Sequence, residues 1–210
     1  GEGILDSIDG LQELTYCRGQ ETQEYNVVEA RLRPGISFDL DRLRRNVFTS
    51  SSCGVCGKTS LEAVAVSGCT ELEDELRVEG ELLPRLPEKL LEGQNGFART
   101  GGLHAAGLFR ADGELHRLRE DVGRHNAVDK VLGRAFLDRE LPADNRILVV
   151  SGRASFEIVQ KALMAKVPIL VAVGAPSSLA VDLSEEFGQT LVGFVRDGGF
   201  NVYCGDVRLI

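Results

Sequence analysis

The chain has 210 residues, with 24 Lys and Arg against 32 Asp and Glu, a formal net charge of −8 and a pI near 5.0. Duplex nucleic acid and anionic membrane surfaces both require a basic face, so neither is expected as a partner. The apolar fraction of 43% and the mean hydropathy of −0.06 are those of an ordinary globular protein. The longest uncharged stretch, residues 167–181, contains two prolines and is too short to span a bilayer.

The five cysteines are an odd number and too sparse for the disulfide framework of a secreted protein. The first residues do not show the basic start and apolar run of a signal peptide. We therefore expect a cytoplasmic protein. Because the chain begins with Gly1 rather than Met, we also expect a trimmed piece of a longer protein.

In the first half of the chain the patterns are short. Residues 1–20 resemble the end of a helix followed by a polar turn, and residues 25–32 alternate as a strand does. Residues 49–58 are small and polar, which is typical of a loop. Residues 71–92 hold eight acidic and three basic residues, so we expect a solvated surface there.

The second half alternates strands with helices. The Asp112-Gly113 pair predicts the turn of a β-hairpin between residues 104–110 and 114–118. Apolar residues in 126–136 recur with the period of a helix. Further strands are predicted at 147–150, 168–173, 190–195 and 200–204, and helices at 154–166 and 177–187. Short apolar strands separated by helices indicate an α/β protein with a parallel sheet covered on both faces.

Three loops follow the predicted parallel strands and must share one edge of the sheet. They read Ser151-Gly152-Arg153, Gly174–Ser177 and Arg196-Asp197-Gly198-Gly199. Ligands of open α/β sheets bind at that edge, where glycines allow a close approach and helix N-termini offer free N–H groups. The sequence therefore predicts a site for an anionic, phosphate-bearing ligand. The alternative is that these Gly and Ser residues only cap helices and form turns.

Cys53 and Cys56 form a Cys-Gly-Val-Cys motif, for which four interpretations compete. Structural zinc usually needs a second cysteine pair, and dithiol oxidoreductases place theirs at a helix N-terminus. A persulfide carrier needs an exposed, movable thiolate. Residues 42–58 contain four bases and no acid, which favours the thiolate. The residue types leave the sulfur relay and the redox dithiol equally open, ahead of zinc and of buried structural thiols.

The other three cysteines, Cys17, Cys69 and Cys204, are expected to be core thiols. Zinc deaminases share this class of fold and carry H-x-E followed by P-C-x-x-C. Here His104 is followed by two alanines, so the general acid–base glutamate is missing. We therefore expect no deaminase activity.

His125 lies in a polar run at the start of the predicted helix. It could line the anion site or move a proton, whereas Asp121 could simply cap the helix. Both interpretations stay open. His116, in the middle of a hairpin strand, is expected to be an ordinary surface residue.

Several longer motifs occur together in the chain. They are residues 44–58 (RRNVFTSSSCGVCGK), 100–106 (TGGLHAA), 120–130 (EDVGRHNAVDK), 151–161 (SGRASFEIVQK), 175–180 (APSSLA) and 194–203 (FVRDGGFNVY). In combination they resemble the formate dehydrogenase accessory sulfurtransferases, the FdhD family. The resemblance runs nearly end to end. Residues 1–5 look like the middle of a family motif, so we expect that an N-terminal portion of the family is absent.

The resemblance implies a three-layer α/β/α, cytidine-deaminase-like fold without deaminase activity. Its mixed sheet would have the parallel strands in the C-terminal half. Residues 1–70 would then be the remnant of an N-terminal region that carries the Cys-Gly-Val-Cys loop. Residues 71–210 would be an α/β cofactor-binding domain, unless the two parts form one continuous domain.

The resemblance also implies a function. Family members are homodimeric sulfur carriers that take persulfide sulfur from a cysteine desulfurase. They pass it to the molybdenum cofactor in its bis-molybdopterin guanine dinucleotide form, which is then inserted into formate dehydrogenase. The cofactor would be a bound substrate, and no permanently bound metal is expected. The alternatives are a non-catalytic molybdenum-cofactor chaperone and a dithiol oxidoreductase.

The resemblance assigns roles to residues as well. Cys53 matches the persulfide cysteine of the family, and Cys56 matches its partner. The family's cofactor-binding segment corresponds to Phe194, Val195, Arg196, Asp197, Gly198 and Gly199. With Ser151, Gly152, Arg153 and His125 from the sheet edge, these are the candidate cofactor-binding residues.

Overall fold

The computed structural model describes residues 5, 7–16, 27–36, 69–72, 76–196 and 198–210. Its packing divides the chain into two units, residues 3–45 and residues 1–2 with 46–210. The division predicted at residue 70 falls within the second unit. Cys53, Cys56 and Asp197 lie outside the described residues.

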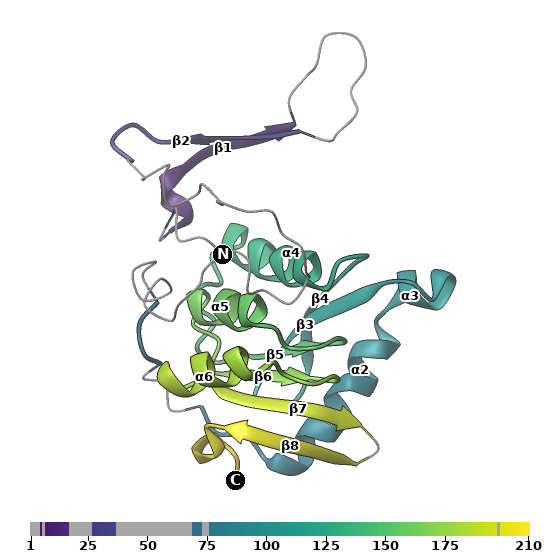
Figure 1. The fold of residues 1–210 in the computed structure, drawn as a ribbon. Helices are drawn as coiled ribbons and strands as arrows, with labels where there is room; N and C mark the ends of the chain where they lie inside the picture. The colour runs from purple at the N-terminus through teal and green to yellow at the C-terminus, as the bar shows by residue number, and fades with distance from the viewer. Residues whose placement is uncertain (1–4, 6, 17–26, 37–68, 73–75, 197) are drawn as a thin grey trace. The chain divides into compact units, whose positions relative to one another are not determined.

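The described part of the second unit is built on a six-stranded sheet with the order β4-β3-β5-β6-β7-β8 (Figure 1). The strands are β3 (His104–Phe109), β4 (Leu115–Asp121), β5 (Ile147–Val150), β6 (Ile169–Ala172), β7 (Thr190–Arg196) and β8 (Gly199–Cys204). β5, β6 and β7 are parallel, whereas β3 and β8 are antiparallel to their neighbours. The expected α/β class, with a mixed sheet and parallel strands in the C-terminal half, is confirmed.

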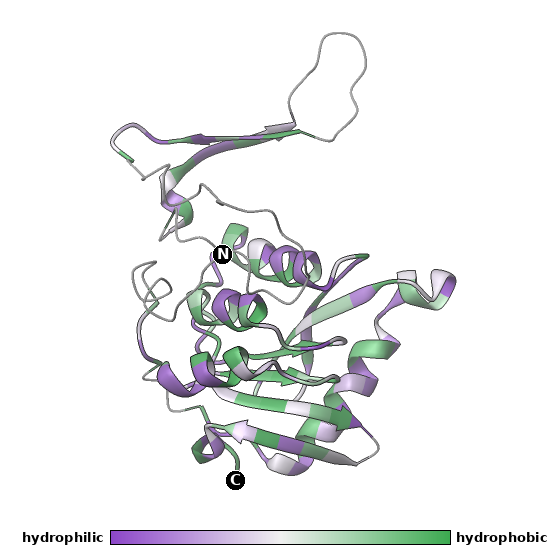
Figure 2. Cartoon of the chain, viewed as in Figure 1, coloured by the Kyte–Doolittle hydropathy of each residue, from purple (hydrophilic) through white to green (hydrophobic). Residues whose placement is uncertain are grey.

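The central strands are apolar along their whole length because both faces of the sheet are covered. Every residue of β5 and β6 is buried. Figure 2 shows these strands as hydrophobic from end to end, whereas the helices around them mix both kinds of residue. Side chains alternate between the two faces along a strand, so Leu148 and Val150 enter one core cluster and Ile147 and Val149 enter the other.

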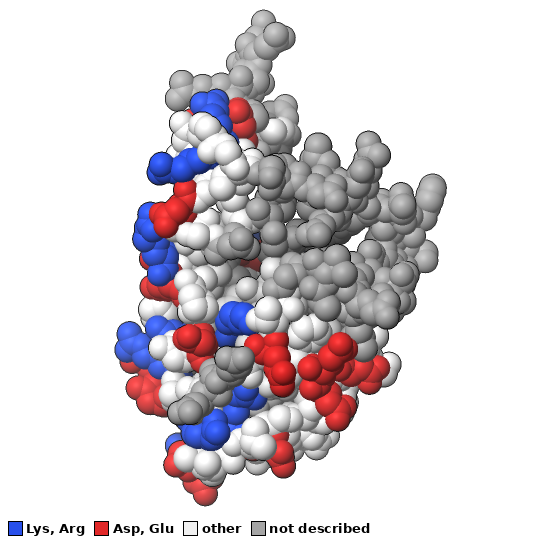
Figure 3. All heavy atoms as spheres, turned by 90° about the vertical axis from the view of Figure 1, so that its left-hand side faces the viewer, with Lys and Arg blue, Asp and Glu red and all other residues white. Residues whose placement is uncertain are grey.

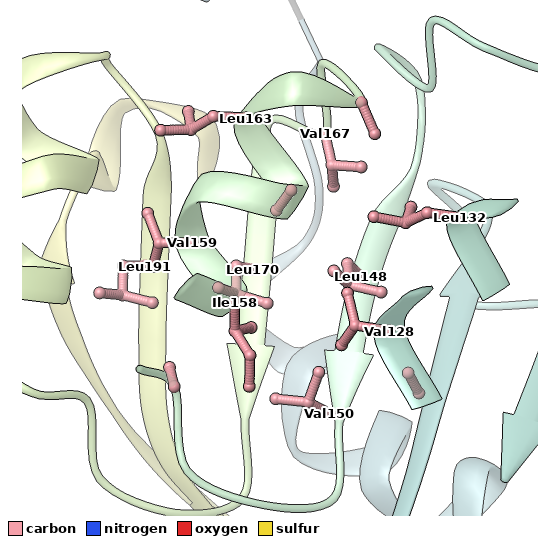
Figure 4. Packing of buried hydrophobic residues seen from close by; sticks show 14 of the residues in the cluster. Val128, Leu132, Leu148, Val150, Ile158, Val159, Leu163, Val167, Leu170 and Leu191 are labelled. Atoms are coloured by element: carbon pink, nitrogen blue, oxygen red, sulfur yellow. The ribbon is translucent and has the colours of Figure 1, made fainter. Parts of the chain in front are cut away.

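Three helices cover the first face: α4 (Arg124–Leu137), α5 (Phe156–Met164) and α6 (Ser178–Glu186) (Figure 1). Val128 and Leu132 of α4 point from the helix toward Leu148 of β5 (Figure 4). Ile158 and Leu163 of α5 lie in the same cluster and are fully buried. The helices predicted at 126–136, 154–166 and 177–187 are confirmed, with ends that differ by a few residues.

The second face is covered by the segment for which the acidic composition predicted a solvated surface. This segment forms a 3₁₀-helix, η3 (Gly80–Arg85), and the helix α2 (Leu86–Glu92), followed by α3 (Asn95–Thr100). Its acidic side chains are exposed, but Leu83, Leu86 and Leu90 are fully buried against the sheet. The segment is therefore a structural layer as well as a surface, because its leucines face the sheet.

The described part of the first unit is a 3₁₀-helix, η1 (Ile8–Gly10), and an antiparallel hairpin of β1 (Leu11–Tyr16) and β2 (Val28–Leu32). The prediction of a helix end within residues 1–20 is wrong for β1, whereas the strand predicted at 25–32 is confirmed by β2. One face of the hairpin is polar, with Arg31 paired to Glu13 at 3.0 Å. The other carries Leu14 opposite Ala30 and Tyr16 opposite Val28.

Candidate ligand-binding crevice

Of the three loops predicted to share one edge of the sheet, those after β5 and β6 are hydrogen-bonded side by side, and the end of β7 joins them through Phe194. Ser151 follows β5, and its Oγ accepts from the backbone N–H of Ala105 on β3 at 2.9 Å. The N–H of Gly174, after β6, donates to the carbonyl of Gly152 at 3.0 Å. The N–H of Phe194 donates to the carbonyl of Gly174 at 3.2 Å. The loops after β5 and β6 and the end of β7 thus form one continuous wall at the carboxyl ends of the parallel strands.

Next to this wall lies a cavity of about 600 Å³. Most of its lining is apolar and comes from Pro84, Pro87, Leu90, Leu91, Phe97, Leu103, Val173 and Val195. Its polar lining consists of Glu88, Gln94, His104, Ser151 and Arg196, with Gly101 and Gly102. A mainly apolar pocket with a few convergent polar groups is the usual form of a small-molecule site.

Of the candidate residues, the structure brings Ser151, Val195 and Arg196 to this cavity. Gly198 instead lines a neighbouring hollow of about 560 Å³, together with Arg85 and Glu88. Because Glu88 borders both spaces, the two hollows are adjacent. The binding roles of all these residues stay predictions.

Arg153 and Arg196 are exposed cations at the crevice edge. Within the described parts of the chain, no carboxylate pairs with either guanidinium. The Arg153 side chain packs over Gly174, where a Cβ would come within 2.9 Å of the Arg153 Cγ. In the view of Figure 3, from the side where β7 begins, the described Lys and Arg side chains instead lie beside Asp and Glu in small groups.

Phe194 has an unusual backbone conformation, with a φ of +53°. A bulky residue in the left-handed region is strained, and such strain is concentrated at functional sites. The pairing of β7 with β8 shifts its register between Gly193 and Arg196, so this part of the strand is bulged. The bulge leaves Phe194 39% exposed while Val195 stays buried.

His125 lies at the N-terminus of α4 but does not line the cavity. Its Nε2 is 2.8 Å from the Oγ of Ser155, which is buried, and 3.9 Å from the carboxylate of Glu157. Burial lowers the pKa of His125, although the charge of Glu157 opposes this effect. Burial thus favours the neutral form of the imidazole.

The capping role considered for Asp121 takes a different form in the structure. Gly123 is the N-cap of α4, and the Asp121 carboxylate accepts from the Gly123 N–H at 2.9 Å and from the Asn126 amide at 3.0 Å. Lys130 pairs with the same carboxylate. These contacts lower the pKa of Asp121 to about 2. Ser177, in contrast, is an ordinary cap, with its Oγ accepting from the Ala180 N–H at 3.3 Å.

The expectation that His116 is an ordinary surface residue is wrong. Its Nε2 is 3.0 Å from the carboxylate of Glu140, which also pairs with Arg117 at 2.9 Å. These two side chains hold the pKa of Glu140 below its usual range. The cluster joins β4 to the loop after α4, and no local pattern reveals it because Glu140 is 24 residues away.

Two of the expected core thiols are described. Cys69 is buried, with its Sγ 3.2 Å from the Met164 Sδ. The Cys204 thiol donates to the Gln189 carbonyl at 3.3 Å, and burial raises its pKa. The raised pKa favours the protonated thiol at Cys204. Among the described residues, no three His, Cys, Asp or Glu side chains are grouped as metal ligands, and no helix is long and apolar enough to cross a membrane.

Sequence reasoning missed the contribution of α2 and α3 to the cavity. The carboxylate of Glu120 on β4 accepts from the backbone N–H groups of Gly96 and Phe97, both at 2.8 Å. This contact fixes α3, so that Phe97 and the following Gly101 line the cavity. The motif at residues 100–106 was a signal that this loop matters, but it gave no sign of Gln94 or Glu88.

Comparison with known proteins gives a consistent result. The model of the FdhD/NarQ family matches residues 1–210. The sulfur carrier protein FdhD of Streptomyces avermitilis is 53% identical over 213 residues, which cover 99% of this chain and 76% of the relative. The protein of the same name from Sulfurisphaera tokodaii is 46% identical over 209 residues, covering 100% of this chain and 76% of the relative.

A solved structure is also similar. It belongs to a protein from Desulfotalea psychrophila described as a formate dehydrogenase accessory protein. The match has a TM-score of 0.60 and 31% sequence identity. It covers 65% of this chain and 61% of the solved chain, so the likeness extends over less than two thirds of each.

Proposed function

This chain belongs to the FdhD/NarQ family, and on that premise we propose that it is a sulfur carrier that serves a formate dehydrogenase. The observation that carries the proposal is the identity of 53% to a protein named as a sulfur carrier, over 99% of this chain. The sulfur would come from a cysteine desulfurase and go to the molybdenum cofactor, as substrate, before insertion into the dehydrogenase. The homodimer implied by the family resemblance is part of the same proposal.

In the first step, the Cys53 thiolate attacks the terminal sulfur of a persulfide on the desulfurase. A sulfur–sulfur bond forms on Cys53, the persulfide bond of the donor breaks, and the donor cysteine leaves as a thiolate. The charge of residues 42–58, with four bases and no acid, supports a thiolate at Cys53.

In the second step, Cys56 attacks the inner sulfur of the Cys53 persulfide and releases hydrosulfide to the substrate. The two thiols supply the two electrons and become a disulfide, which a small thiol or a dithiol reductant then reduces. The family resemblance assigns these roles to Cys53 and Cys56, which lie outside the described residues.

The crevice supports the other half of the proposal. The molybdenum cofactor in its guanine dinucleotide form carries pyrophosphates, which are anions. Arg153 and Arg196 lack carboxylate partners among the described residues, and the N-termini of α5 and α6 face the same edge. Cations and helix N-termini together favour phosphate binding.

Mass spectrometry of the purified protein tests the proposal directly. After incubation with a cysteine desulfurase and cysteine, the peptide that contains Cys53 should gain ~32 Da, the mass of one sulfur. Cys53→Ala should abolish the gain, whereas the core variant Cys204→Ala should keep it. No gain on this peptide in the wild type or in Cys56→Ala, which lacks the thiol that releases the sulfur, would favour the chaperone. A Cys53–Cys56 disulfide that forms before any desulfurase is added would favour the oxidoreductase.

A further inference from the structure

Gln94 is a buried polar residue whose side chain has no hydrogen-bond partner among the described residues. Only 4% of its surface is exposed, and it lines the 600 Å³ cavity. Its backbone is fully used, because its N–H donates to the Leu91 carbonyl and its carbonyl accepts from the Ala98 N–H, both at 3.0 Å. Its side-chain carboxamide makes no hydrogen bond within the described parts of the chain.

Polar groups in protein interiors are nearly always hydrogen-bonded, so a carboxamide without a protein partner on a residue this buried is available to a bound molecule. The Nε2 of Gln160 is also unpaired, but it is enclosed by protein. The Gln94 carboxamide instead borders the open volume of the cavity. It therefore offers one donor and one acceptor to a ligand at a position that the backbone hydrogen bonds hold in place.

Glu88, in α2, lines the same cavity. Its carboxylate has no ion-pair or hydrogen-bond partner among the described residues. A carboxylate only accepts hydrogen bonds, so it suits a ligand edge with two adjacent N–H donors. A carboxamide that lines the same cavity suits a ligand edge that also has a carbonyl oxygen.

The walls of the cavity favour a flat ring. Phe97, Leu91, Leu103 and Val195 supply apolar surface, and Arg196 is the only cation among the described lining residues. Aromatic and apolar side chains stack on the faces of heterocyclic bases. An apolar slot with a carboxylate, a carboxamide and one arginine fits a polar-edged ring attached to an anion.

We propose that Glu88 and Gln94 recognise the 2-amino-oxopyrimidine edge of a ring bound in this cavity. Guanine and pterin both present this edge, with a ring N–H and an exocyclic amine for Glu88 and a carbonyl oxygen for Gln94. The inference rests on the proposed function, since the molybdenum cofactor with its guanine dinucleotide contains both rings. The inference adds to that function the two residues that would distinguish guanine or pterin from other bases.

Isothermal titration calorimetry of the whole chain with GDP, IDP, ADP and 6-hydroxymethylpterin tests the proposal. IDP lacks only the exocyclic amine, so GDP should bind about tenfold more tightly, the effect of losing a hydrogen bond to a charged group. ADP should bind more weakly still. If the pterin occupies the cavity instead of the guanine, 6-hydroxymethylpterin should show the dependence on Glu88 and GDP should not.

Two variants locate the effect. Glu88→Gln should bring GDP and IDP affinities together. Gln94→Leu should weaken GDP binding about tenfold with little change in melting temperature, because the carboxamide has no hydrogen bond to the described protein that would be lost. The controls are Glu92→Gln and Asn95→Leu, exposed neighbours that do not line the cavity. They should leave binding unchanged.

Equal affinities of the wild type for GDP, IDP and ADP, together with no pterin binding, would overturn the proposal. So would unchanged ligand affinities in both cavity variants. Sulfur loading of Cys53 is measured on the same proteins and reports on the proposed function separately. If the protein loads sulfur but does not distinguish the rings, the proposed function is supported and the proposed roles of Glu88 and Gln94 are wrong.

Discussion

The two faces of the sheet are formed by the same strands but are packed differently. On the face of α4, α5 and α6, the apolar side chains form a closed cluster (Figure 4). On the face of α2, the apolar cluster is smaller, and a cavity of about 600 Å³ is lined by α2 together with residues at the ends of β5, β6 and β7. The helix α2 has seven residues, whereas α4 has fourteen. One face is thus closed, and the other carries a cavity.

The largest expected effect is on the closed face. Leu163→Ala removes a fully buried side chain from the cluster and should lower the free energy of unfolding by about 2–5 kcal/mol. Leu91→Ala, an exposed residue that lines the cavity, should cost less than about 1 kcal/mol. Urea denaturation measures both. Equal losses would mean that the two faces do not differ in packing.

The second effect concerns binding on the open face. Arg196→Ala removes the cation of the cavity lining and should weaken GDP binding about tenfold or more, with little change in stability. Calorimetry measures the affinity. Arg99→Ala is the matched control, since this arginine is exposed and does not line the cavity. Unchanged affinity for GDP in Arg196→Ala would place the phosphate site elsewhere.

The third prediction tests the backbone strain at Phe194, near the end of β7. Glycine adopts the φ of +53° found at Phe194 without strain, whereas alanine does not. Phe194→Gly should therefore be more stable than Phe194→Ala by about 1 kcal/mol, the reverse of the usual order in a strand. Thermal denaturation of the two variants gives the comparison. A more stable alanine variant would show that the left-handed conformation is not kept in solution.

The smallest effect depends on pH. The pKa of Asp121 falls from 3.8 to about 2 on folding, chiefly through Lys130 and the Gly123 N–H. Its contribution to stability is therefore complete above about pH 4 and is lost as the pH falls through 2. Because the Lys130 side chain is half exposed, we expect only about 1 kcal/mol.

Asp121→Asn should remove this contribution at neutral pH and flatten the acid limb of the stability curve. Chemical denaturation between pH 2 and pH 7 measures it. Asp144→Asn is the control, because Asp144 is exposed and has no charged partner among the described residues. If both variants lose stability in the same way as the pH falls, Asp121 does not contribute to the pH dependence of stability.

Local patterns were sufficient where burial is complete. β5 and β6 are continuous apolar runs, and α4 shows its buried face every three or four residues, so their type could be predicted without knowledge of their neighbours. The order of strands and helices then brings the loops after β5, β6 and β7 to one edge. These elements were predictable because their burial is regular: every residue of β5 and β6 is buried, and one face of α4 is buried along its length.

The sequence by itself thus determined the α/β class, the shared edge of the three loops and the cysteine motif with its basic surroundings. Only the tertiary structure decided that the acidic segment around α2 covers the second face, that His116 pairs with Glu140, and that Gln94 is buried beside a cavity. In each case the deciding contact joins residues far apart in the chain. The burial and pairing of a polar side chain depend on such partners, which a local pattern does not contain.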